Sequence, residues 1–246
     1  MSFSAAEQRI GSAASGARIT QPVIRPIEAV SRRSMTMSRV ALGFSLITAA
    51  GGVFAASIAV RATDALGKPV ADAAVYAVPA AGGSEAKNAR ASIEQVDREF
   101  VPYVSVIQQG TTVTFPNRDP ILHHVYSFSP PKQFEIKLYT GKSPSEILFD
   151  RAGVVVLGCN IHDWMAAYVV IVPTPYFGRT DEKGAATLRD LPAGAYEVRT
   201  WHPHQRAALV PHAVTLAAAG EASAAFTFDL LPRKAKFKPP LDRLRY

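Results

Sequence analysis

Short apolar runs rich in β-branched and aromatic residues recur along the chain from position 57 onward, and no long segment carries the spacing of an amphipathic helix. Representative runs are 57–60, 103–107, 154–157 and 168–172. Turn signals rich in Gly, Pro, Asn and Asp separate such runs. They include 66–69, 116–120 and 181–184. The pattern predicts an all-β chain built from β-sandwiches.

The apolar run 40–56 differs from these strands, because it follows Arg39 and closes on small residues around Ala55. This layout predicts a secretory signal peptide, with 1–55 as extension and signal and Ala56 as the first mature residue. The run is short for a membrane span and contains a Gly pair. An uncleaved anchor is the alternative. Either route indicates a periplasmic or other extracytoplasmic protein.

The formal net charge of +7 is concentrated at the two ends of the chain. Residues 1–55 carry +4 and residues 233–246 carry +5, so the stretch between them is close to neutral at −2. Nucleic-acid binding needs a basic face and is therefore not expected. The basic tail 233–246 is predicted to leave the fold, either as a solvated extension or as a contact for an acidic partner or an anionic membrane.

Three residues that can bind a metal lie close together in the sequence. A strand-like run ends at Cys159, and His162 and Met165 follow it. Thiolate and thioether are soft ligands for Cu⁺, and imidazole suits both Cu⁺ and Cu²⁺. Two imidazoles and one thiolate with a weak axial thioether form the known electron-transfer copper site. Cys159 is the single cysteine, and an odd thiol in an oxidising compartment reacts, pairs between chains or binds a ligand.

The second imidazole has to come from a distant part of the chain, and His123 and His124 follow the turn 116–120. Because successive side chains of a strand point to opposite faces, only one of the two can reach the metal. The other is expected beside the site or in water. Structural zinc is the main rival for such a set, but zinc sites generally take four strong ligands.

These segments resemble the copper-binding pattern of plastocyanin and amicyanin. The matching segments are Val113–Asn117, Leu122–Val125 and Cys159-x₂-His162-x₂-Met165. The resemblance implies a cupredoxin-like Greek-key β-sandwich that holds copper. The upstream ligand of that family is a histidine followed by asparagine, which maps onto His123. His124 occupies the asparagine position and stays the alternative ligand.

The same resemblance implies roles for residues around the metal. Asn117 would hydrogen-bond near the thiolate loop, although a turn-forming Asn is equally ordinary. His162 would be a partly exposed route for electrons. Cys159 would couple the metal electronically, and Met165 would tune its potential.

Two further segments, 62–75 and 180–196, resemble the halves of a small transthyretin-like sandwich found in carboxypeptidase regulatory domains. About a hundred residues separate them. We predict that a copper domain, 90–173, is inserted into a loop of a sandwich made from 56–89 and 174–232. The alternative is a tandem arrangement with 56–89 as the first hairpin of the copper domain. The combination resembles proteins labelled "methylamine utilization protein".

No Ser/His/Asp series, glycine-rich phosphate loop or paired carboxylates stand out, so an enzyme is not expected. The expected function is one-electron transfer through Cu⁺/Cu²⁺, with transient docking to a periplasmic dehydrogenase, oxidase or cytochrome. A copper carrier or buffer is the first alternative, with a role for further histidines. These are His202, His204 and His212. A structural accessory module with a vestigial site is the second alternative.

Overall fold

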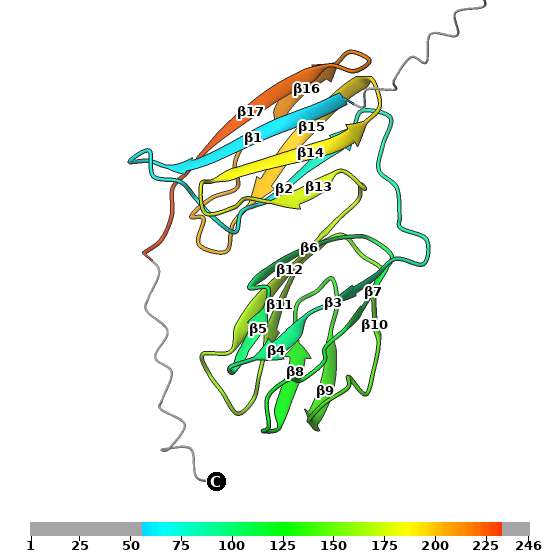
Figure 1. Ribbon diagram of the computed structural model, residues 1–246, viewed down its shortest axis with the longest axis vertical. Helices are drawn as coiled ribbons and strands as arrows, with labels where there is room; N and C mark the ends of the chain where they lie inside the picture. The colour runs from blue at the N-terminus through cyan, green and yellow to red at the C-terminus, as the bar shows by residue number, and fades with distance from the viewer. Residues whose placement is uncertain (1–55, 233–246) are drawn as a thin grey trace, which may run out of the picture. The chain divides into compact units, whose positions relative to one another are not determined.

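The computed structural model describes residues 56–232, and these residues form strands, turns and loops without a helix (Figure 1). The prediction of an all-β chain is confirmed. In the part of the chain that the structure describes, no helix is long and apolar enough to cross a membrane. The predicted leader, 1–55, and the basic tail, 233–246, lie outside the described residues.

One group of strands, which we call the outer sandwich, is formed by two separate stretches of the chain. Its strands are β1 (Ala56–Asp64), β2 (Ala74–Pro79), β13 (Phe177–Arg179), β14 (Ala185–Leu191), β15 (Gly194–Trp201), β16 (His212–Leu216) and β17 (Glu221–Phe228). They pair in the orders β14-β1-β17 and β13-β2-β15-β16. Along β17 buried and exposed residues alternate, so that Ala224, Phe226 and Phe228 enter the core of this sandwich.

The strands between β2 and β13 form a second group, which we call the central sandwich. They are β3 (Arg90–Ser92), β4 (Glu94–Val96), β5 (Glu99–Val101), β6 (Val104–Gln108), β7 (Thr111–Thr114), β8 (His123–Ser127), β9 (Phe134–Tyr139), β10 (Ile147–Phe149), β11 (Gly153–Gly158) and β12 (Ala166–Val172). Five of them pair in the order β6-β12-β11-β8-β9, and three in the order β10-β7-β3. Strands β4 and β5 form a separate hairpin.

The pairing of β1 and β2 bears on the domain arrangement. Among the described residues, β1 pairs with β14 and β17, and β2 pairs with β13 and β15. Neither strand is assigned a partner in the central sandwich. The chain leaves the outer sandwich after β2 and returns to it at β13. The bounds 56–89, 90–173 and 174–232 remain predictions.

Each sandwich has its own apolar core. The core of the outer sandwich contains large side chains such as Ile58, Leu188 and Phe228. The core of the central sandwich contains Phe115, Phe149 and Leu157, and it extends to Cys159 and Met165. The predicted ligand sulfurs therefore belong to buried residues that pack in this hydrophobic core.

Candidate metal centre

The loop that carries three of the predicted ligands is the connection of a β-hairpin. Strands β11 and β12 are antiparallel, and the register pairs Gly158 with Ala166. Cys159 follows the last residue of β11, and Met165 precedes the first residue of β12. The amide of Met165 donates to the carbonyl of His162 at 2.8 Å, which closes the loop on itself. The hairpin thus brings a thiol, an imidazole and a thioether to one end of the sheet.

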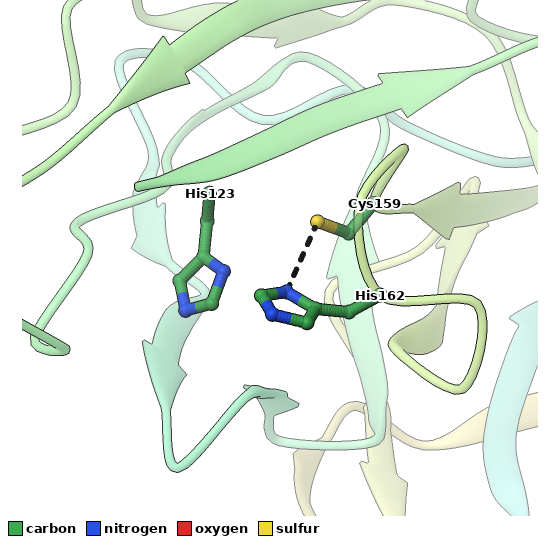
Figure 2. A group of neighbouring side chains, drawn as sticks. All are labelled: His123, Cys159 and His162. Atoms are coloured by element: carbon green, nitrogen blue, oxygen red, sulfur yellow. Dashed lines mark hydrogen bonds between the residues drawn. The ribbon is translucent and has the colours of Figure 1, made fainter. Parts of the chain in front are cut away.

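His123 joins this loop from a different strand. It is the first residue of β8, and β8 lies beside β11 through the pairing of Tyr126 with Gly158. Figure 2 shows that His123, Cys159 and His162 converge, with a ring nitrogen of each histidine turned toward the space between them. One potential ligand atom from each of the three residues lies within 4.8 Å of the others. The structure therefore assembles a Cys/His₂ group from residues up to 39 positions apart in the sequence.

The distance between two of these atoms suits a trigonal metal site. The sulfur of Cys159 lies 3.7 Å from Nδ1 of His162 (Figure 2). Ligands at about 2.3 Å (sulfur) and 2.0 Å (nitrogen) from one ion, separated by about 120°, lie about 3.7 Å apart. The third atom supports the same assignment, because Nδ1 of His123 is buried and has no hydrogen-bond partner. A buried nitrogen without a partner is costly unless it binds something, so the donor set fits a metal ion.

The remaining nitrogen of His123 is held by a carboxylate. Nε2 of His123 lies 2.6 Å from Oδ2 of Asp119. Burial alone would raise the pKa of Asp119, but hydrogen bonds from His123 and from the amides of Arg98 and Asp97 hold that pKa below its ordinary value. Asp119 is therefore an ionised acceptor near neutral pH, and Nε2 of His123 is the donor. This arrangement leaves the lone pair on Nδ1, the nitrogen that faces Cys159 and His162.

His124 lies in a different environment from its neighbour. Its Nε2 lies 3.0 Å from Oε1 of Glu135 on β9, and its ring is tilted by 42° against the ring of Tyr126, with the centroids 5.5 Å apart. It does not belong to the group of potential ligand atoms formed by His123, Cys159 and His162. The structure thus brings His123, and not His124, to the other two residues, as the alternation of side chains along a strand requires.

All four predicted ligand residues are enclosed. The exposed fractions are 0% for His123, 4% for Cys159, 1% for His162 and 1% for Met165. The expectation that His162 is partly exposed is therefore wrong. The ring of Trp164 stands 5.2 Å from the ring of His162, centroid to centroid, and contributes to covering it. Burial lowers the pKa of His162, and Coulombic repulsion from the nearby Arg98 lowers it further. The neutral, ligand form of this imidazole is thereby favoured.

A pocket meets the site on the side of the sulfur residues. Its lining includes Cys159 and Met165 together with Tyr126, Phe128 and Val156. His162 and His123 are not part of that lining. Met165 packs in the same core cluster as Cys159, which is compatible with its predicted role as an axial ligand.

Asn117 acts on the His123 segment, which is the turn-forming role that the sequence left open beside a contact near the thiolate loop. Its side-chain amide donates to the carbonyls of Ile121 and Tyr139, each at 2.8 Å. Its side-chain oxygen accepts from the amide of Asp119 at 2.9 Å. Asn117 therefore shapes the turn that leads into β8. Sequence reasoning also missed Asp119, although an acidic residue four positions before a candidate ligand histidine was a usable signal.

The histidines of the outer sandwich do not form a second such group. His202 and His204 have ring centroids 5.6 Å apart, and His204 also lies near the hydroxyl of Tyr103. Within residues 56–232, the Cys/His₂ group is the only cluster of three or more His, Cys, Asp or Glu residues with the spacing of metal ligands. A metal-delivery surface built from His202, His204 and His212 thus has no geometric support in this part of the chain.

Comparison with known proteins gives similarity at the level of structure only. No protein-family model matches the sequence, and no curated protein matches it. A reduced amicyanin variant aligns at 17% identity with a TM-score of 0.32, over 39% of this chain and 99% of the amicyanin. A purple cupredoxin from Nitrosopumilus maritimus aligns at 24% identity and a TM-score of 0.30, over 35% of this chain and 100% of that one.

A copper-containing nitrite reductase from Thermus scotoductus is also similar, at 24% identity and a TM-score of 0.32. The alignment covers 46% of this chain but only 28% of the reductase. These similarities concern the fold and leave the chemistry of the site to the side chains described above.

Proposed function

We propose that this chain is an extracytoplasmic, mononuclear copper protein of the cupredoxin type that carries single electrons between redox partners. His123, Cys159 and His162 are the strong ligands, and Met165 is the weak axial one. Copper supplies a one-electron Cu⁺/Cu²⁺ couple at such a site. The observation that carries the proposal is the trigonal spacing of 3.7 Å between the Cys159 sulfur and Nδ1 of His162, with the unpartnered Nδ1 of His123 facing them.

The surroundings of these residues support electron transfer over catalysis. The four predicted ligand side chains are enclosed, and an axial thioether opposes an open coordination position. The ligands are held at the end of paired strands, so their positions change little when the charge of the site changes by one electron. The partners are periplasmic redox proteins such as a dehydrogenase, an oxidase or a cytochrome, which dock transiently.

Copper reconstitution tests the proposal directly. Cu²⁺ is added to the metal-free protein, and the visible spectrum and electron paramagnetic resonance are recorded for the unmodified chain and for Cys159→Ser. We expect an intense thiolate-to-copper band in the unmodified protein and none in the variant. A weak, nearly colourless copper site that survives Cys159→Ser would show that the assignment is wrong.

Electron exchange separates an electron carrier from a copper buffer. The copper-loaded protein is mixed with a reduced c-type cytochrome, and oxidation of the cytochrome is followed by stopped flow. A carrier oxidises the cytochrome much faster than the Cys159→Ser control does. Release of copper to a chelator without such electron exchange would favour the buffer.

A further inference from the structure

The turn of the β4–β5 hairpin is connected to His123, a predicted metal ligand, by hydrogen bonds through the carboxylate of Asp119. Val96 pairs with Glu99, which leaves Asp97 and Arg98 as a two-residue turn. Both have a positive φ, 52° and 59°, as a type I′ turn requires. Asn-Gly or Asp-Gly is the usual sequence for such a turn, and Arg at its second position is unfavourable. The conformation is kept although the sequence does not favour it.

This conformation lets the successive backbone amides of Asp97 and Arg98 both donate hydrogen bonds to the carboxylate of Asp119. The amide of Asp97 donates to Oδ1 of Asp119, and the amide of Arg98 donates to Oδ2, each at 2.8 Å. His123 donates to the same Oδ2 through Nε2 at 2.6 Å. The carboxylate therefore accepts three hydrogen bonds from two separate parts of the central sandwich. Its orientation is fixed from both sides.

The hairpin itself is anchored to the segment that carries His123. Gln95 is fully buried, and its side-chain amide donates to the carbonyl of Phe115 at 2.9 Å and to the hydroxyl of Tyr139 at 2.5 Å. The amide of Arg118 donates to the carbonyl of Gln95 at 2.8 Å. The turn thus cannot move away from Asp119 without breaking buried hydrogen bonds, which is costly.

We propose that Asp119, oriented by the amides of Asp97 and Arg98, is a positioning residue that fixes the Nδ1-ligating form of His123 and shifts the copper couple toward Cu²⁺. The proposal rests on the proposed function. A carboxylate that accepts a proton-bearing nitrogen of a ligand imidazole fixes the tautomer and raises the basicity of the other nitrogen. A more basic ligand with a negative charge behind it stabilises Cu²⁺ more than Cu⁺, because the interaction grows with the charge of the ion.

Two variants that each remove one negative charge test this inference. Asp119→Asn keeps the size of the side chain but leaves one oxygen to serve three donors. Asp163→Asn is the matched control, because Asp163 is exposed and directly follows His162 in the ligand loop. Affinities of both variants for Cu²⁺ and for Cu⁺ are measured by chelator competition, together with the reduction potential.

We expect Asp119→Asn to weaken Cu²⁺ binding by about 10–100-fold, which is the usual effect of losing a carboxylate behind a ligand histidine. The loss of affinity for Cu⁺ should be about tenfold smaller. A tenfold difference between the two ions corresponds to a rise in potential of about 59 mV for a one-electron couple. Asp163→Asn should change either affinity by less than about threefold, because its carboxylate is screened by solvent.

Three outcomes overturn the inference. Equal losses of Cu²⁺ and Cu⁺ affinity in Asp119→Asn would reduce Asp119 to a structural role. Equal effects of the two variants would indicate a general charge effect. Failure of the unmodified protein to form the thiolate-to-copper band would overturn the proposed function and this inference with it.

A measurement on the unmodified protein applies even if Asp119→Asn does not fold. ¹⁵N–¹H correlation spectra of the metal-free protein at neutral pH report which ring nitrogen of His123 carries the proton. We expect the proton on Nε2 and a bare Nδ1. A proton on Nδ1 alone would contradict the role given to Asp119.

Discussion

The two parts of the chain that build the centre are held in opposite ways. The loop 159–165 is closed by its own backbone and by the strand pair on either side of it. The segment 117–123 is held from outside, because Asp119 accepts hydrogen bonds from the β4–β5 turn and Asn117 donates to the carbonyl of Tyr139. The comparison teaches that the sulfur ligands depend on local structure, whereas the orientation of His123 depends on several distant contacts.

Separate substitution of His123 and His124 should give the largest difference in copper affinity, and it tests which of them belongs to the metal centre. We expect His123→Ala to weaken Cu²⁺ binding by roughly a hundredfold or more, since a strong ligand contributes about 3 kcal/mol to metal affinity. His124→Ala should change affinity by less than about threefold, because its ring bonds to Glu135 instead. Chelator competition measures both. A larger loss in His124→Ala would make His124 the ligand.

Removal of one asparagine from each part tests how each is held. Asn117→Ala should lower the free energy of unfolding of the metal-free protein by about 2–3 kcal/mol, because it leaves the buried carbonyl of Tyr139 and the amide of Asp119 without their partner. Asn160→Ala, on the exposed side of the ligand loop, should cost less than about 0.5 kcal/mol. Urea denaturation gives both values. Equal costs would remove the distinction between the two parts.

Substitution of Met165, the predicted axial ligand, should have a smaller effect on copper binding than loss of His123. Met165→Leu nearly conserves volume in a buried site, so the free energy of unfolding should fall by less than about 1.5 kcal/mol. Copper and the thiolate band should persist, and the reduction potential should rise, because loss of a donor favours Cu⁺. Voltammetry and the visible spectrum check this. Loss of the band would mean that Met165 is needed to assemble the site.

Acidification of the metal-free protein should affect the two parts in different pH ranges. The folded state lowers the pKa of His162 from about 6.5, so the unfolded chain binds more protons and stability falls as pH drops below that value. The pKa of Asp119 is also lowered, from about 3.8, so its contribution is lost only in more acidic solution. Urea unfolding between about pH 7 and pH 5 should therefore depend less on pH in His162→Gln than in the unmodified protein. An unchanged dependence would exclude His162 as its source.

The strand pattern and the spacing of Cys159, His162 and Met165 were readable from sequence because both are local. A strand repeats every two residues, and a ligand loop between paired strands needs only its own residues and a fixed register. Strands β1 and β2 do pair with β14 and β15, but the transthyretin-like resemblance of these segments stays a prediction. What the sequence suggested about the surroundings of the metal was less accurate. His162 is enclosed, although partial exposure was expected, and Asn117 has only the turn-forming one of its two expected roles.

The sequence by itself determined the strands, the thiolate–imidazole–thioether loop and the pair of histidines from which the fourth predicted ligand comes. Only the tertiary structure decided which histidine faces Cys159 and which nitrogen of it is available. The physical reason is that an imidazole is oriented by whatever accepts its second nitrogen. Here that acceptor is Asp119, and its own donors lie at positions 97 and 98, which meet it only in the folded sandwich.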